Sequence, residues 1–262
     1  MNSTTLEVLF TPAEFAALEA RDLTETVCVV FDILRASSSM VTALANGATA
    51  IMPVAEISEA LALHRDQPGI MLAGERDGVS IPSHLTGGIS FDLGNSPREF
   101  TKQKVQDRTI AMTTTNGTRA LRSCARAWTV FVGSFLNLRA TSELLLREPP
   151  RHLLLVCSGT FDQAAYEDVL GAGALCELLW PTYSTGAVSD SAEMARRLYL
   201  LEKDDLSAAM TWSRNSRRLL ANLDLADDVP LCLQRDQFNL VAELQPDGYV
   251  RRRSEGSPGS PA

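Results

Sequence analysis

The first polar group that could do chemistry contains Asp32 and Arg35, three residues apart, and the helix start at Ser37. A carboxylate such as Asp32 can ligate a hard cation through oxygen. Arg35 can hold a phosphate through two parallel N–H bonds, and a helix start presents free N–H groups to an anion. A capped helix with a solvated arginine would have the same residues. We expect Asp32 and Arg35 to be catalytic and Ser37 to contact the substrate.

The second group is the charged segment Glu75-Arg76-Asp77 between two glycines, and the third surrounds Asn95. Glu75 could be a catalytic base or a metal ligand, and Arg76 a second anion clamp. The alternative for this segment is an ordinary charged turn. Asn95 would contact the substrate, or would belong to a loop that caps a helix.

The fourth group places Thr114, Thr115, Asn116 and Arg119 around a glycine, between an apolar run and a helical pattern. Hydroxyl, amide and backbone N–H groups in such a turn form a natural oxyanion cradle. Strand threonines followed by a helix cap are the alternative. The spacing is not that of a nucleotide-binding P-loop, which occurs nowhere in the chain.

The fifth group is Ser158-Gly159-Thr160, followed by Glu167 and Asp168. The three small residues are further candidates for substrate binding. The acidic pair could complete a cation site with Asp32 and Glu75, or could be the acidic first turn of a helix. Carboxylate oxygens suit Mg²⁺, so the expected metal ligands are Asp32, Glu75, Glu167 and Asp168.

Each of these groups follows a short apolar run, and helical patterns separate most of the runs. We expect strands over residues 27–31, 50–54, 70–73, 109–113, 128–132, 153–157 and 238–242. Helices are expected over residues 37–46, 58–64, 118–124, 137–146, 165–179, 189–202 and 205–223. This alternation predicts an α/β fold in which a mainly parallel or mixed sheet has helices on both faces, as three layers. Ligands of such sheets bind at the carboxyl ends of the strands.

Length and composition suit a single domain over residues 1–250, followed by a disordered tail over 251–262 that is rich in Arg, Ser, Gly and Pro. The net charge of −8 argues against general binding of nucleic acid. No apolar run is long enough to span a membrane, and no signal peptide is recognised. The five cysteines show no Cys-x-x-Cys spacing, so we expect reduced thiols and a cytoplasmic protein.

Six strings, in this order, resemble the 2-phosphosulfolactate phosphatase family, also called the ComB family. They are FDILRASSSMVTALANGA, GERDG, FDLGNSP, TTTNGTRAL, VGSFLN and CSGT, followed by YEDVLGAGAL. The resemblance implies a ComB-like fold and Mg²⁺-dependent hydrolysis of 2-phosphosulfolactate to sulfolactate and phosphate. In methanogenic archaea this step belongs to coenzyme M biosynthesis. The implied partner is a small anionic phosphorylated substrate, and a homo-oligomer is possible.

The sequence leaves two alternatives open. Asp32 could attack phosphorus and form an aspartyl-phosphate, or it could be a metal ligand while a metal-bound water attacks; we favour water. The chain could also act on another small phospho-acid, or be a non-catalytic anion-binding domain on the same fold. If Arg35 clamps phosphate, Arg35→Lys should lower kcat/KM while the melting temperature barely moves.

Overall fold

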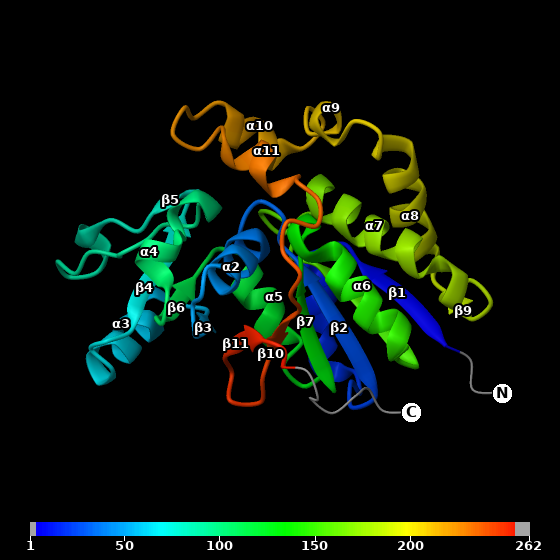
Figure 1. The fold of residues 1–262 in the computed structure, drawn as a ribbon, viewed down its shortest axis with the longest axis horizontal. Coiled ribbons are helices and arrows are strands. Elements are labelled where there is room, and N and C mark those ends of the chain that lie inside the picture. Colours follow the sequence, from blue (N-terminus) through cyan, green and yellow to red (C-terminus); the bar gives the residue numbers. More distant parts are fainter. Residues whose placement is uncertain (1–3, 255–262) are drawn as a thin grey trace.

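The computed structural model describes residues 4–254, whose strands form one mixed sheet (Figure 1). In chain order the strands are β1 (Thr5–Leu9), β2 (Thr26–Phe31), β3 (Ala50–Val54), β4 (Met71–Arg76), β5 (Val79–Ser80), β6 (Thr109–Thr113), β7 (Thr129–Gly133), β8 (His152–Cys157), β9 (Ala187–Val188), β10 (Ala242–Leu244) and β11 (Val250–Arg252). Across the sheet they follow the order β5-β4-β6-β3-β11-β10-β7-β2-β8-β1-β9.

Two blocks of parallel strands make up most of this sheet. One contains β4, β6 and β3, and the other contains β7, β2, β8, β1 and β9. The antiparallel hairpin β10–β11 joins the blocks by pairing with β7 on one side and β3 on the other. The sheet is therefore mixed, within the range that the sequence predicts.

Helices cover both faces of the sheet. They are α1 (Pro12–Ala16), α2 (Ala36–Ala45), α3 (Ile57–Asp66), α4 (Lys102–Val105), α5 (Gly117–Ser123), α6 (Leu138–Arg147), α7 (Tyr166–Tyr183), α8 (Asp190–Glu202), α9 (Leu206–Ala209), α10 (Arg214–Leu220) and α11 (Asp228–Cys232). Short 3₁₀ turns occupy Ala17–Ala20, Ser83–Leu85, Pro97–Glu99 and Phe135–Asn137.

Strand β2 shows why the chain forms three layers. Successive strand side chains point to opposite faces. Val27 and Val29 accordingly pack in the apolar cluster that contains residues of α6, α7 and α8. Cys28 and Val30 pack in the cluster that contains residues of α2 and α5. Every residue of β2 is buried, so the strand lies at the centre of the fold. The expected α/β fold with helices on both faces is confirmed.

The C-terminal third differs most from expectation. The single helix expected over 205–223 is two short helices, α9 and α10. Ser213 separates them, because its hydroxyl accepts a hydrogen bond from the Ser216 N–H and starts a new helix there. The strand expected over 238–242 begins only at Ala242. In Figure 1, α9, α10 and α11 lie together at the top of the view, above the central strands.

The fold continues beyond residue 251, where the sequence predicts the start of a disordered tail. Arg251 and Arg252 belong to β11, where they pair with Glu243 and Ala242. Arg253 follows with an ion pair to Glu243 at 2.9 Å. Residues 251–254 therefore belong to the fold because the hairpin needs them, while residues 255–262 lie outside the described part of the chain.

Two expectations about the environment can be compared with the structure. Within residues 4–254, no helix is long and apolar enough to cross a membrane. The five cysteines are all buried free thiols, as expected of a chain without disulfides.

Candidate active site

Asp32 directly follows β2, and local hydrogen bonds fix its position. Its Oδ1 accepts from the Ala36 N–H at 3.1 Å, at the start of α2. The Ser37 hydroxyl accepts from the Asp32 N–H at 3.0 Å and donates to the Asp32 carbonyl at 2.8 Å. Ser37 was expected to contact substrate, but it is 3% exposed and holds the Asp32 backbone. In this geometry its role is to position Asp32.

The environment of Asp32 disfavours its charge. Burial, and to a lesser extent the nearby charge of Glu75, raise the pKa of the Asp32 carboxyl from 3.8 to about 6, against the hydrogen bond from the Ala36 N–H, which lowers it. A cation placed beside Asp32 would therefore stabilise its ionised form. Asp32 lines a pocket that Glu75 also lines.

Gly117 brings the two blocks of strands into contact at Asp32. It begins α5 directly after the loop that follows β6. A Cβ at this position would lie 2.5 Å from Asp32 Oδ2 and 2.7 Å from the Ala36 Cβ. Only glycine leaves room for the carboxylate here, so the close approach is a requirement of the site.

We expect Gly117→Ala to lower kcat/KM roughly 100-fold, because a displacement of about 1 Å at a reacting group can have that effect. Overpacking should also lower stability by about 1–3 kcal/mol, even though alanine normally favours a helix. Kinetics and thermal unfolding of the purified variant measure both effects. The control is Gly69→Ala, where a Cβ meets nothing within 4 Å. Parental activity in Gly117→Ala would contradict the placement of Asp32.

Glu75 is held by a different set of donors. It lies near the end of β4, which continues to Arg76, beyond the end at residue 73 that the sequence predicts. Its Oε1 accepts from the backbone N–H and the hydroxyl of Thr115, both at 2.8 Å, and its Oε2 accepts from the Gly78 N–H at 2.7 Å. Glu75 thereby closes the turn to Gly78, joins it to the loop after β6, and faces the pocket.

The other two expected metal ligands, Glu167 and Asp168, lie behind the pocket. Asp168 accepts from the Ile33 and Gly159 N–H groups and from the Ser158 hydroxyl. Burial, and then the charge of Asp32, raises the pKa of Asp168 well above its usual range. Glu167 accepts from the Ser213 hydroxyl at 2.7 Å and the Asn215 amide at 3.1 Å. Neither carboxylate lines the pocket with Asp32 and Glu75.

The four acidic residues therefore do not form one ligand shell. Across residues 4–254, no group of three or more His, Cys, Asp or Glu side chains is placed to hold a metal. What the fold brings together is the pair Asp32 and Glu75.

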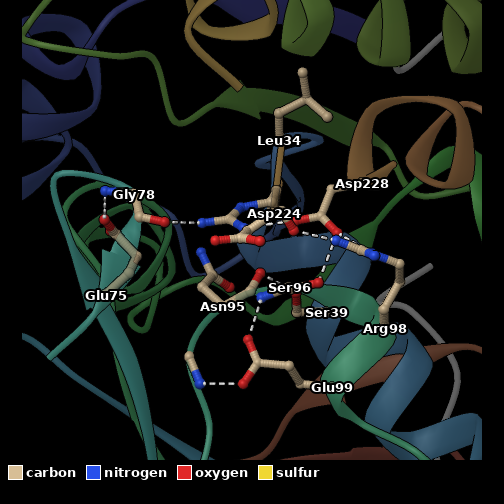
Figure 2. Close-up of polar contacts among 12 residues, drawn as sticks. Leu34, Ser39, Glu75, Gly78, Asn95, Ser96, Arg98, Glu99, Asp224 and Asp228 are labelled. Atoms are coloured by element: carbon tan, nitrogen blue, oxygen red, sulfur yellow. Dashed lines mark hydrogen bonds and ion pairs between the residues drawn. The ribbon is translucent and has the colours of Figure 1, made fainter. Parts of the chain in front are cut away.

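Arg35 lines the pocket, but its guanidinium is already bound to protein groups. It is 3% exposed, and its Nη1 lies 2.6 Å from Asp228 Oδ2 while its Nη2 donates to the Gly78 carbonyl at 2.5 Å. Asp228 also accepts from the Ser96 hydroxyl at 2.6 Å and from Arg98 Nε at 2.8 Å, as Figure 2 shows. Arg35 thus ties the Glu75–Gly78 turn to α11. The sequence analysis did not single out Asp228.

The two other arginines expected at the site bond elsewhere. Arg76 donates to the Glu75 carbonyl at 2.7 Å and to the Thr113 hydroxyl at 3.0 Å. Arg119 is exposed and lies 4.0 Å from an oxygen of Asp162. Neither side chain lines the pocket that contains Asp32.

The expected hydroxyl and amide groups divide in the same way. Thr115, Asn116, Gly159, Thr160 and Asn95 line the pocket. Thr114 and Ser158 are buried behind it, where Thr114 bonds with Thr118 and Ser158 donates to Asp168.

Asn95 differs from the others because its side chain is incompletely bonded. Asn95 is 5% exposed, and its Oδ1 has no hydrogen-bond partner among the described residues. Figure 2 shows its side chain among Glu75, Gly78 and Ser96. A buried polar atom without a partner is costly in a folded protein, so this atom is available to a ligand.

Part of the pocket comes from residues that the sequence analysis missed. Phe161, Asn215 and Arg218 also line it, the last two from α10. Asn215 donates to the Leu34 carbonyl at 2.6 Å, which ties α10 to the loop after β2. The available signal is the pair Arg217-Arg218 in an otherwise acidic chain, which the sequence analysis treats only as part of a helix.

A family model described as 2-phosphosulpholactate phosphatase matches residues 13–247. A probable 2-phosphosulfolactate phosphatase of Caldanaerobacter subterraneus subsp. tengcongensis is 36% identical over 239 residues, which cover 90% of this chain and 95% of the relative. The protein of the same name from Pseudothermotoga lettingae is 36% identical over 248 residues, covering 94% of this chain and 99% of the relative. The family match includes every residue that lines the pocket.

Proposed function

The chain belongs to the 2-phosphosulpholactate phosphatase family and is a phosphoric monoester hydrolase, and we propose that it hydrolyses 2-phosphosulfolactate to sulfolactate and phosphate. The observation that carries the proposal is the pocket itself. It brings the Asp32 and Glu75 carboxylates together with arginine and amide groups, near the ends of strands from both blocks. In such a pocket the carboxylates can bind a cation, and the arginine and amide groups can bind an anion.

We propose Mg²⁺ as the cofactor, held by Asp32 and Glu75. Mg²⁺ in phosphate-handling enzymes is usually bound by one or two carboxylates together with water and substrate phosphate, so a pair of carboxylates is sufficient. The raised pKa of Asp32 supports the fit, because a buried carboxylate beside a second one gains from a cation. When bound, the ion would neutralise charge that develops on the phosphate.

The residues around the pair would orient the reaction. Thr115 and Gly78 hold Glu75 through three hydrogen bonds, so its oxygens keep one direction. Asn116 and Thr160 line the same space with groups able to hydrogen-bond phosphate oxygens. Water is the proposed nucleophile. A phosphorylated Asp32 peptide, isolated after an acid quench during turnover, would instead identify Asp32 as the nucleophile.

Removal of the metal is expected to abolish turnover. Because Asp32 and Glu75 alone leave the substrate phosphate facing two negative charges, chelation with EDTA should reduce phosphate release to background, and added Mg²⁺ should restore it. The measurement is phosphate release from 2-phosphosulfolactate before chelation, after it and after adding Mg²⁺. A chelated enzyme that keeps its full rate would refute the metal proposal while leaving the phosphatase proposal standing.

We also propose that the protein acts in the cytoplasm. The five buried free thiols support this location, because they need a reducing compartment to stay unpaired on unfolding and refolding.

A further inference from the structure

The charges that line the pocket are unevenly balanced. Asp32, Glu75 and Asp77 contribute three acidic side chains, and Arg35 and Arg218 contribute the two arginines. Arg35 is neutralised by Asp228 at 2.6 Å. Among the described residues, no carboxylate forms an ion pair with Arg218. Arg218 is therefore the pocket cation whose charge remains available to a ligand.

The surrounding residues hold the Arg218 side chain in place. Its Nη2 donates to Asn215 Oδ1 at 3.2 Å, and its guanidinium carbon lies 5.4 Å from the centre of the Phe161 ring. Asn215 is itself fixed by the Leu34 carbonyl and by Glu167. A cation–π contact holds a guanidinium near an aromatic ring without using its N–H groups, which can then bind an anion.

Burial in the hydrophobic core does not explain the position of the Phe161 ring. Its side chain is 53% exposed, and its φ of 49° is in the left-handed region that non-glycine residues rarely adopt. Strained residues of this kind cluster at ligand sites. Arg214 lies 5.6 Å from the same ring and is bound to the Thr160 carbonyl at 2.8 Å. The ring thus lies near two guanidiniums at the mouth of the pocket.

A second feature of the same pocket also points to a ligand. The unpartnered Asn95 Oδ1 belongs to a residue that is 5% exposed and that lines this space. Arg218 approaches the turn after β4, where its Nη2 lies 3.4 Å from the position of a Cβ on Gly78. The same pocket therefore contains a carboxylate pair, an unpartnered amide oxygen and a guanidinium without an ion pair among the described residues.

We propose that Arg218 binds the carboxylate or sulfonate of the substrate and so makes the enzyme specific for phospho-acids with a second anion. This inference rests on the proposed function. Asp32 and Glu75 are the proposed ligands of Mg²⁺, which binds the phosphate, so the Arg218 guanidinium, which has no ion pair among the described residues, is the pocket group that is left for a second anion. A bidentate guanidinium contact accepts a pair of oxygens from either a carboxylate or a sulfonate. Arg218 is thus a specificity-determining residue that touches the group that does not react.

Binding of unphosphorylated ligands tests the proposal apart from turnover. Sulfolactate, lactate and inorganic phosphate are titrated separately by calorimetry into the parent, Arg218→Met, Arg218→Lys and Arg217→Met proteins, all with Mg²⁺ present. Arg217 neighbours Arg218 on α10 and donates to the Thr211 and Trp212 carbonyls, away from the pocket lining, so it is a matched control. Thermal unfolding of each variant shows whether α10 remains folded.

We expect Arg218→Met to weaken sulfolactate binding about 10- to 100-fold, the usual loss for one charge-assisted contact, with phosphate binding unchanged. Arg218→Lys should lose less, because it keeps the charge without the planar fork. If lactate binding is weakened as much as sulfolactate binding, Arg218 binds the carboxylate. If lactate binding is unaffected, Arg218 binds the sulfonate. Arg217→Met should bind as the parent does.

Three results would overturn the inference: a parent that does not bind sulfolactate, an Arg218→Met protein that binds it as the parent does, or an equal loss of sulfolactate and phosphate binding. A parent that binds sulfolactate through Arg218 but releases no phosphate from 2-phosphosulfolactate would instead overturn the proposed function alone.

Discussion

Replacing Asp32 by asparagine is expected to abolish turnover and, in the metal-free protein, to raise the melting temperature. Turnover should fall about a thousandfold, because loss of one charge that acts on the transition state typically costs about 3–4 kcal/mol. Stability should rise because the native state holds Asp32 where its charge is disfavoured, with a pKa raised from 3.8 to about 6. The same carboxylate is thus favourable for the reaction and unfavourable for folding.

The pH dependence follows from the sign of this shift. The folded state binds the Asp32 proton more tightly than the unfolded state, so Asp32 favours folding fully only below about pH 4, and this contribution is lost as pH rises through about 6. At pH 8 the ionised carboxylate destabilises the fold by about 3 kcal/mol, roughly 5–10 °C for a chain of this size. The asparagine side chain of the variant cannot ionise, so its advantage should be large at pH 8 and should shrink towards pH 5.

Thermal unfolding in EDTA at pH 5 and pH 8, with kinetics in Mg²⁺, measures both effects. Asp66→Asn is a suitable control because Asp66 is an exposed carboxylate at the end of α3, and it should change neither quantity. An Asp32→Asn protein that is no more stable than the parent at pH 8 would mean that the fold does not disfavour the ionised form of Asp32.

Substitution of Arg35 should affect folding as well as catalysis. The sequence suggests an anion clamp whose replacement by lysine would leave the melting temperature nearly unchanged. The structure contradicts this, because Arg35 is 3% exposed and bonds at once to Asp228 and to the Gly78 carbonyl. Lysine can keep one of these partners, and the other is left buried without a donor at a cost of about 1–3 kcal/mol.

Arg35→Met should be worse than Arg35→Lys, since it removes both hydrogen bonds and leaves Arg98 as the remaining ion-pair partner of the buried Asp228 among the described residues. The bridge that joins the Glu75–Gly78 turn to Asp228 would be lost in both variants, so kcat/KM should fall with stability. Denaturant unfolding of both variants and of Asp228→Asn measures how much the Arg35–Asp228 ion pair contributes to the free energy of unfolding. Arg98→Met is a control, because Arg98 bonds to Asp228 from a site 36% exposed. Parental stability in Arg35→Lys would refute the buried-anchor role.

The strand ends are predictable from the sequence because local patterns define them. Residues 50–54 and 109–113 are strands with the expected bounds. Asp32 lies just beyond the end of β2, and Glu75 lies near the end of β4. Short apolar runs that end in polar residues mark the end of a strand, and they can be recognised from a few neighbouring residues. This explains why the amino-acid sequence alone indicates the fold class and includes both pocket carboxylates among its four expected metal ligands, without separating them from Glu167 and Asp168.

The contribution of α10 and α11 to the site could not be predicted, because their contacts join distant parts of the chain. Asp228 is 193 residues from Arg35, and Asn215 is 181 residues from Leu34. No local pattern marks which of several arginines will face a pocket and which will be neutralised. The sequence therefore could not separate Arg35, which braces the fold, from Arg218, whose charge is free of any ion pair among the described residues.

The most direct test of the central claim is phosphate release by the parent enzyme over a panel of phosphorylated acids, with Asp32→Asn purified in parallel to exclude contaminating phosphatases. The panel contains 2-phosphosulfolactate, phospholactate and phosphoglycerate, each with Mg²⁺. We predict the highest kcat/KM for 2-phosphosulfolactate and no release above background by Asp32→Asn. A folded parent that releases phosphate from none of these acids, or an Asp32→Asn protein that matches it, would contradict the assignment of this pocket as a phosphatase site.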